Sequence, residues 1–317
     1  MKIMVTGGCG FIGSNFVRYL IEKGYNVINY DSLTYAGNLD NLKDIENNNQ
    51  YEFVKGDVCD KKLVMKSMKG CDVVVHMAAE SHVDRSITGP EIFTMTNVVG
   101  TKIMLEAARQ LDIKKFIYMS TDEVYGSIEE GLFTENHIFD PTSPYSASKA
   151  GADLMVQAYF KTFALPTITI RGSNNFGPYQ FPEKLIPLFI SNITDGKKVP
   201  VYGTGKNVRD WIYVKDTCRA LLFLIKNGKV GEAYNVGGGN ERTNIFITKT
   251  ILENFGKDDS MIEYVEDRKG HDLRYALDST KLFKLGFKQK YDFESALNET
   301  INWYENNETW WRKLKNE

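Results

Sequence analysis

The fold is decided by a glycine-rich turn near the N-terminus, with the sequence TGGCGFIG at residues 6–13. A short apolar run precedes this turn, and an amphipathic helical pattern follows it. Gly7, Gly10 and Gly13 allow a tight turn and let backbone N–H groups approach a pyrophosphate at the positive end of the helix. A glycine triplet alone often marks a plain turn, but a strand before it and a helix after it predict a dinucleotide site.

Asp31 ends the next apolar run, about the expected distance after the glycine turn. A carboxylate there hydrogen-bonds the adenosine ribose hydroxyls and repels a 2′-phosphate, so it favours NAD over NADP. The competing interpretation of Asp31 is a helix N-cap or a turn residue.

Two further segments follow apolar runs and are expected at the same edge of the sheet. Ligands of parallel sheets sit beyond the carboxyl ends of the strands. Asp57 follows the third run and can hold the adenine amino group, whereas Met77, Ala78 and Ala79 follow the fourth and leave space for a cofactor.

Short apolar runs alternate with longer amphipathic stretches through the first half of the chain. The expected strands are Lys2–Thr6, Asn26–Asp31, Tyr51–Lys55, Asp72–Met77, Lys115–Ser120 and Pro166–Arg171, with helical patterns at 11–23, 61–69, 89–111 and 145–163. Nearly unbroken β-branched runs indicate strands covered on both faces, and the alternation implies right-handed crossovers. We therefore predict an α/β fold with a doubly wound parallel sheet.

The pattern changes after Arg171, where a polar loop and three prolines break the chain into short elements. The pieces Trp211–Val214 and Ala233–Val236 are expected to return to the main sheet. We predict a Rossmann domain at residues 1–171 that also receives about 211–237. Residues 172–210 and 238–317 would form a smaller α/β lobe.

Bulk properties limit the possible classes of function. The chain has 42% apolar residues and a formal net charge of −2, so no general attraction to nucleic acid or an anionic membrane is indicated. No apolar run is long enough to span a membrane and no signal sequence is evident, which predicts a cytoplasmic protein. The four cysteines form no CxxC pair, and the four histidines have no ligand spacing, so no disulfide framework or metal site is expected.

Tyr145 and Lys149 begin a helical pattern after Pro144 and share one helical face. A lysine ammonium near a phenol favours the phenolate, so Tyr145 is a suitable base for a hydroxyl that loses hydride. Such a pair usually marks an exposed helix face, but its place after the fifth strand favours catalysis.

From Thr6 to at least Tyr275, the chain resembles the extended short-chain dehydrogenase/reductase family. Within that family, the segment TDEVYG at 121–126 resembles that of the dTDP-glucose 4,6-dehydratases, in which the corresponding Asp and Glu perform dehydration. Two adjacent acids elsewhere usually mean a solvated loop. Beside a hydride acceptor, an acid and a base indicate elimination.

Further stretches carry the resemblance: YAGNL at 35–39, AAESHVDRS at 78–86, SNNFGPYQFPEKLIP at 173–187 and NVRDW at 207–211. The resemblance implies that NAD is the cofactor and that a nucleotide sugar binds in the smaller lobe. The implied catalytic residues are Thr121, Asp122, Glu123, Tyr145 and Lys149. The implied cofactor-binding residues are Gly7, Gly10, Phe11, Ile12, Gly13, Asp31, Ser32, Thr34, Asp57, Val58, Met77, Ala78, Ala79, Ser81, Thr96, Tyr145, Lys149 and Asn175. The implied substrate-binding residues are Ser81, Thr121, Asn174, Lys184, Leu185, Pro200, Tyr202, Arg209, Asn244, Asp267 and His271.

Five positions depart from the family pattern. Cys9 replaces a usual alanine, Ser32 a lysine, Phe176 a tyrosine, Lys269 a proline and Leu273 an arginine. The last two are expected near the nucleotide end, so they affect the prediction of the base more than that of the chemistry.

The resemblance implies dehydration of dTDP-glucose by C4 oxidation, loss of water across C5 and C6, and hydride return to C6. The alternatives are a 4-epimerase, a decarboxylase or a dehydratase for another nucleotide sugar, and an NAD-binding sensor without catalysis. The patterns at 89–111 and 145–163 either pack against a second subunit, giving a homodimer as in the resembling family, or pack only against the sheet.

Overall fold

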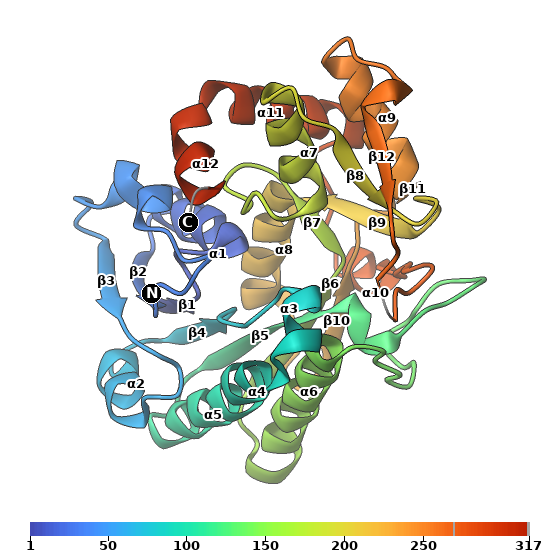
Figure 1. Cartoon of the computed structure of the whole chain (residues 1–317). Coiled ribbons are helices and arrows are strands. Elements are labelled where there is room, and N and C mark those ends of the chain that lie inside the picture. The colour runs from blue at the N-terminus through green and yellow to red at the C-terminus, as the bar shows by residue number, and fades with distance from the viewer. Residues whose placement is uncertain (269, 316–317) are drawn as a thin grey trace.

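The computed structural model describes residues 1–268 and 270–315. A seven-stranded sheet forms its centre, and every pair of neighbouring strands in it is parallel (Figure 1). In spatial order the strands are β10 (Ala233–Val236), β6 (Thr167–Gly172), β5 (Lys115–Thr121), β4 (Val73–His76), β1 (Lys2–Thr6), β2 (Asn26–Asp31) and β3 (Tyr51–Lys55). The order reverses direction between β1 and β4, which is where doubly wound sheets bind ligands.

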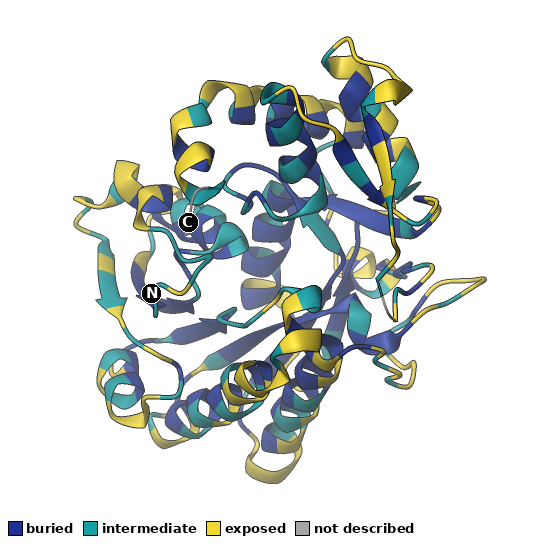
Figure 2. Ribbon diagram, in the orientation of Figure 1, coloured by how far each residue is buried: buried dark blue, intermediate teal, exposed yellow. Residues whose placement is uncertain are grey.

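Alternating side chains of the sheet enter two separate cores. Ile3 and Val5 of β1 pack into one cluster with α1 (Phe11–Glu22) and α8 (Val214–Asn227). Met4, between them, packs into a second cluster with α2 (Lys61–Met68), α5 (Thr101–Gln110) and α6 (Pro144–Phe163). The strands are therefore buried between two helical layers, as the dark central ribbons of Figure 2 show. The predicted doubly wound α/β class is confirmed.

Most predicted elements agree with the structure to within a residue or two. The 89–111 pattern divides into α4 (Pro90–Phe93), a π-helical segment η2 (Thr94–Gly100) and α5, preceded by α3 (Val83–Thr88). Ala233–Val236 returns to the main sheet as predicted, beside β6. The same prediction for Trp211–Val214 is wrong. Its residues belong to β9 (Val208–Tyr213) in another sheet and to the start of α8, because β9 pairs with β7 and β11 instead.

The second lobe contains two small sheets. One has the order β11 (Glu241–Thr243), β9 and β7 (Asn174–Phe176); the other pairs β12 (Ile262–Val265) with β8 (Val199–Tyr202). Its helices are α7 (Leu185–Thr194), α9 (Asn244–Asn254), α10 (Thr280–Lys284), α11 (Phe293–Asn306) and α12 (Glu308–Lys315). The remaining short helical turns are η1 (Leu39–Ile45), η3 (Asp122–Tyr125) and η4 (Asp259–Met261).

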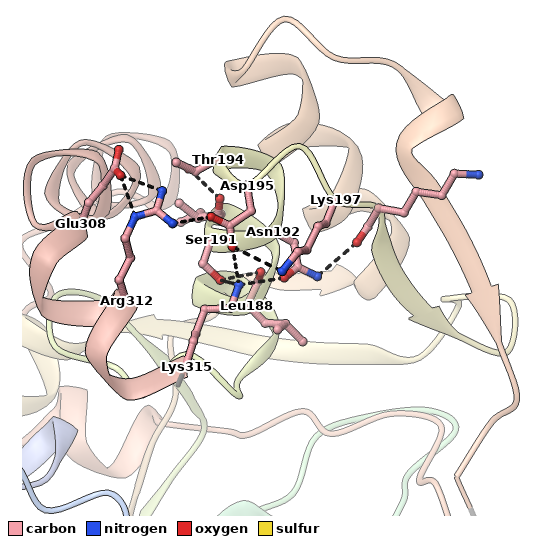
Figure 3. A network of polar contacts seen from close by, with 11 residues as sticks. Leu188, Ser191, Asn192, Thr194, Asp195, Lys197, Glu308, Arg312 and Lys315 are labelled. Atoms are coloured by element: carbon pink, nitrogen blue, oxygen red, sulfur yellow. Dashed lines mark hydrogen bonds and ion pairs between the residues drawn. The ribbon is translucent and has the colours of Figure 1, made fainter. Parts of the chain in front are cut away.

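The C-terminal helix α12 packs against α7 of the second lobe through the polar network shown in Figure 3, and it also contacts the first lobe. Arg312 and Lys315 bind Asp195 at the end of α7, with donor–acceptor distances of 2.6 and 3.2 Å. On the other side of α12, Trp310 Nε1 donates to Asn41 Oδ1 in η1 at 2.8 Å. These partly exposed ion pairs contribute little by themselves, so the buried Trp310 and Trp311 are the main anchor.

Among the described residues, no helix combines the length and the apolar character needed to cross a bilayer.

Candidate active site

A cavity of about 370 Å³ opens at the carboxyl ends of the parallel strands. All the predicted cofactor-binding residues line it, including Gly7, Gly13, Asp31, Asp57 and Lys149. The five predicted catalytic residues line the same cavity. Residues distributed over more than 160 positions of the chain therefore meet at one edge of the sheet.

The glycine turn has no room for side chains. Gly7 has a φ of +71°, and a Cβ there would lie 2.8 Å from the backbone nitrogen of Ala78. A Cβ on Gly13 would overlap the carbonyl oxygen of Gly7. Helix α1 begins after Gly10 without a side-chain cap, and its first residues line the cavity. Uncapped amides at a helix N-terminus favour an anion such as a pyrophosphate.

Asp31 links the glycine turn to the end of β2. Its Oδ2 accepts the N–H of Cys9 at 2.9 Å, and its Oδ1 accepts the N–H of Leu33 at 2.8 Å. Burial raises the pKa of this carboxyl group, and the two backbone N–H groups oppose the rise. Asp31 is thus a turn residue and also a member of the cavity wall, so the two interpretations of its role are compatible.

The loop after β4 is held against the glycine turn by Thr6. Its hydroxyl oxygen accepts the N–H groups of Met77 and Ala78, both at 3.1 Å. The ring of His76 joins this hydroxyl to that of Thr101, at 2.7 and 2.9 Å. Burial, with a smaller effect of Lys149, lowers the pKa of His76 to about 3, so its ring is neutral. Across the described part of the chain, no cluster of three potential metal ligands occurs.

Tyr145 and Lys149 project from the first turns of α6. Lys149 Nζ donates to the carbonyl oxygen of Met119 at 2.5 Å, and burial lowers its pKa to about 7 despite the opposing charge of Asp153. Burial and the nearby Glu123 raise the pKa of Tyr145. The Thr121 hydroxyl acts in the opposite direction and favours the phenolate.

Asp122 and Glu123 lie in η3, directly after β5. Burial raises the pKa of Asp122 well above its usual range, and the neighbouring Glu123 and Asp210 raise it further. Burial also raises the pKa of Glu123, but Arg268 and Arg209 oppose this by favouring its carboxylate form. The two acids therefore differ in environment in the way that suits one proton donor and one proton acceptor.

The predicted substrate-binding residues divide into two groups. Ser81, Thr121, Asn174 and Lys184 line the cavity. Within residues 1–268 and 270–315, the other seven lie outside its lining: Leu185, Pro200, Tyr202, Arg209, Asn244, Asp267 and His271.

Several of these seven residues are nevertheless brought together in the second lobe. His271 Nδ1 lies 2.6 Å from Asp267 Oδ1, and its ring meets that of Tyr202 edge-on at 6.2 Å. Arg209 is buried over the ring of Tyr275, with its Cζ 4.3 Å from the ring centroid. One of its amino groups donates to the carbonyl oxygen of Asp272 at 2.9 Å.

Tyr35 and Glu183 are among the cavity-lining residues that were not assigned to the site from the sequence. The Tyr35 hydroxyl donates to Glu183 Oε1 at 3.1 Å, and Arg85 contacts both, 3.8 Å from the Tyr35 ring centroid and 3.4 Å from Glu183 Oε2. Each residue lies in a quoted motif, but 148 positions separate them. No spacing rule signals such a contact, because only the meeting of the two lobes creates it.

Four of the five departures from the family pattern lie in the described part of the chain. Cys9 is buried with a pKa raised to about 12, mainly by burial, and Phe176 lies in the hydrophobic core. Ser32 lines the cavity, and the Leu273 side chain is exposed. Lys269 lies outside the described residues.

Comparisons with known proteins agree with this geometry. The family model described as GDP-mannose 4,6 dehydratase matches residues 4–300. The chain is 51% identical to the low-salt glycan biosynthesis protein Agl12 of Haloferax volcanii, with 96% of this chain and 98% of that protein covered. It is 48% identical to the dTDP-glucose 4,6-dehydratase of Escherichia coli, with 99% and 96% covered.

A solved structure has nearly the same fold. The dTDP-glucose 4,6-dehydratase DesIV of Streptomyces venezuelae, crystallised with NAD bound, superposes with a TM-score of 0.98 at 47% identity. The match covers 99% of this chain and all of that one.

Proposed function

The chain belongs to the GDP-mannose 4,6 dehydratase family, and on this premise we propose that it converts dTDP-glucose to dTDP-4-dehydro-6-deoxyglucose. It would be a hydro-lyase that keeps NAD bound throughout the reaction. The observation that carries the proposal is the position of Asp122 and Glu123, in the same cavity wall as Tyr145 and Lys149.

The cavity fits NAD. The backbone of the glycine turn is packed too closely for a Cβ at Gly7 or Gly13, and the uncapped start of α1 beside it suits the pyrophosphate. Asp31 would bind the adenosine ribose, Asp57 the adenine amino group and Lys149 the nicotinamide ribose. When bound there, NAD would supply reversible hydride transfer for the oxidation at C4 and the reduction at C6.

Tyr145 would begin the reaction by taking the proton of the C4 hydroxyl. The Thr121 hydroxyl would assist by favouring the phenolate, and a protonated Lys149 ammonium would act in the same direction. Burial of the site strengthens these electrostatic effects, because water is excluded around the phenol.

Elimination would follow from the C4 ketone, which acidifies the hydrogen on C5. Glu123 would remove that proton as a carboxylate, and Asp122 would protonate the departing C6 hydroxyl. Burial raises the pKa of both acids, but the neighbouring charges support this division: Glu123 and Asp210 raise the pKa of Asp122 further, whereas Arg268 and Arg209 oppose the rise at Glu123.

Residues of the second lobe would hold the nucleotide. Lys184 lines the cavity and Arg209 lies near Glu123, so both can supply positive charge to a diphosphate. We assign the remaining predicted residues, including Tyr202, Asn244 and His271, to the nucleotide end. In domain terms, 1–171 would bind NAD, and 172–210 with 238–317 would bind the nucleotide sugar.

We also propose a homodimer formed through the layer that contains α4, η2 and α6. Large apolar side chains are exposed there, including Ile92, Met95, Leu154 and Phe163. Equilibrium sedimentation tests this assembly.

The proposed location is the cytoplasm, which suits a chain whose four cysteines are all free thiols.

Purified protein tests the reaction when incubated separately with dTDP-, UDP-, CDP- and GDP-glucose. The expected result is a 4-keto product, seen by its alkaline absorbance, with dTDP-glucose preferred. Preference for another nucleotide would redirect the assignment within the family. Bound NAD without turnover of any sugar nucleotide would indicate a sensor.

Glu123→Gln tests the proposed division of roles. We expect dehydration to fall by about a hundredfold to ten-thousandfold. C4 oxidation should continue, so reduced cofactor should accumulate and absorb at longer wavelength than NAD. Dehydration at the parent rate would contradict the role of Glu123.

A further inference from the structure

A buried guanidinium lies between the two segments that carry the catalytic groups. Arg171, near the end of β6, has a side chain that is only 3% exposed, and that of its partner Asp153 is 0% exposed. Arg171 Nε and Nη2 bind the two oxygens of Asp153 at 2.9 and 3.1 Å. This is a bidentate pair, whose planar fork fixes the direction of both side chains.

Asp153 lies on the helix that carries the oxidation groups. It follows Tyr145 by eight residues and Lys149 by four, so all three lie toward one face of α6. The charge of Asp153 also acts on Lys149. The position of Arg171 is therefore coupled to the face that presents Tyr145 and Lys149.

The other end of Arg171 reaches the segment of the elimination groups. Its Nη1 donates to the Tyr125 hydroxyl at 2.8 Å, and that hydroxyl donates to Asn235 Oδ1, also at 2.8 Å. Tyr125 is the last residue of η3, the turn that begins with Asp122 and Glu123. The Tyr125 ring is stacked on Phe133 with centroids 4.9 Å apart, so the ring has a second, apolar anchor.

We propose that Arg171 is a positioning residue that acts through Asp153 on α6 and Tyr125 on η3. It fixes the elimination pair, Asp122 and Glu123, relative to the oxidation pair, Tyr145 and Lys149. This inference rests on the proposed function, since both pairs must reach one hexose in succession. Displacement of η3 by about 1 Å would misplace the acids by enough to slow elimination roughly a hundredfold.

Tyr125→Phe is the sharpest test, because it removes one hydroxyl and keeps the stacked ring. Elimination should slow by roughly tenfold to a hundredfold, with C4 oxidation changed by less than about twofold. Reduced cofactor should therefore accumulate when dTDP-glucose is added. Arg171→Lys, which retains charge without the fork, should act in the same direction.

Tyr159→Phe is the matched control. It removes a tyrosine hydroxyl from α6, where that hydroxyl contacts Glu106 at 3.3 Å, away from the turn η3. No accumulation of reduced cofactor is expected in this variant. Equal slowing of both half-reactions in Tyr125→Phe, or no slowing, would overturn the positioning role and leave only a structural one.

Hydrogen exchange provides a readout that does not need turnover. In Tyr125→Phe, the amides of residues 122–126 should exchange about tenfold faster than in the parent, while α1 is unchanged. Unchanged exchange in 122–126 would also overturn the proposal. If the parent protein made no 4-keto sugar, the proposed function would fail, and the exchange measurement would still decide whether Arg171 holds this turn.

Discussion

The residues that we propose to bind the cofactor and those that we propose to bind the nucleotide differ in how they are built into the fold. We call residues Gly7, Gly13, Asp31, Asp57 and Ala78 the cofactor wall, and Tyr202, Arg209, Asn244, Asp267 and His271 the nucleotide wall. The cofactor wall is made from the ends of neighbouring strands in one sheet and the first turn of α1, and all of it lines the cavity. The nucleotide wall comes from separate short elements, and in the described residues none of its five members lines that cavity.

Hydrogen bonding shows what this difference means. In the cofactor wall, backbone groups fix the side chains from within the same sheet edge, as the N–H groups of Cys9 and Leu33 fix Asp31. In the nucleotide wall, Arg209 binds the carbonyl of Asp272, and the buried Oδ1 of Asn244 has no partner among the described residues. We infer that the cofactor wall is formed before ligand binding, whereas the nucleotide wall completes its hydrogen bonds with the ligand.

Gly13→Ala is expected to have the largest effect on NAD binding by the cofactor wall. The new methyl group would overlap the Gly7 carbonyl oxygen, so the turn must shift away from the position that suits a pyrophosphate. We expect NAD affinity to fall by at least about a hundredfold, or about 2.7 kcal/mol, measured by titration calorimetry. Gly151→Ala, also within a helix, is the control, because its new Cβ meets only Val98 at 3.5 Å. Parent-like affinity in Gly13→Ala would show that the wall is not preformed.

The pH dependence of stability tests whether Lys149 is buried away from water in the folded protein. Its pKa in the folded protein is about 7, below the ordinary value of 10.5. At pH values between these two pKa values, Lys149 is protonated in the unfolded chain but neutral in the folded chain. A rise in pH therefore favours folding. Relative to Lys149→Met, the parent's free energy of unfolding should rise from pH 7 to 10 by up to about 1.4 kcal/mol per unit. Denaturant unfolding without added cofactor measures this slope, and parallel curves would show that Lys149 stays charged.

The same contrast explains what could be predicted from the sequence. Strand ends of a parallel sheet share an edge, so Asp31 and Asp57 were placed by local pattern alone. The return of Trp211–Val214 to the main sheet was predicted wrongly, because a short apolar run does not specify which sheet it joins. The contact between Tyr35 and Glu183 was not predicted, because it depends on how the two lobes meet.

Arg209→Lys probes the nucleotide wall and has the smallest expected effect. Lysine keeps the charge but lacks the planar fork, so it is less suited to bind the Asp272 carbonyl and the proposed diphosphate at the same time. We expect the KM for dTDP-glucose to rise about tenfold, equivalent to about 1.4 kcal/mol, with kcat and bound NAD unchanged. Arg242→Lys is a close control, since Arg242 lies opposite Arg209 in the β9–β11 pair but has a distant contact with Glu294 at 3.9 Å. A loss of bound NAD in Arg209→Lys would contradict the separation of the walls, because a residue of the nucleotide wall would then also hold the cofactor.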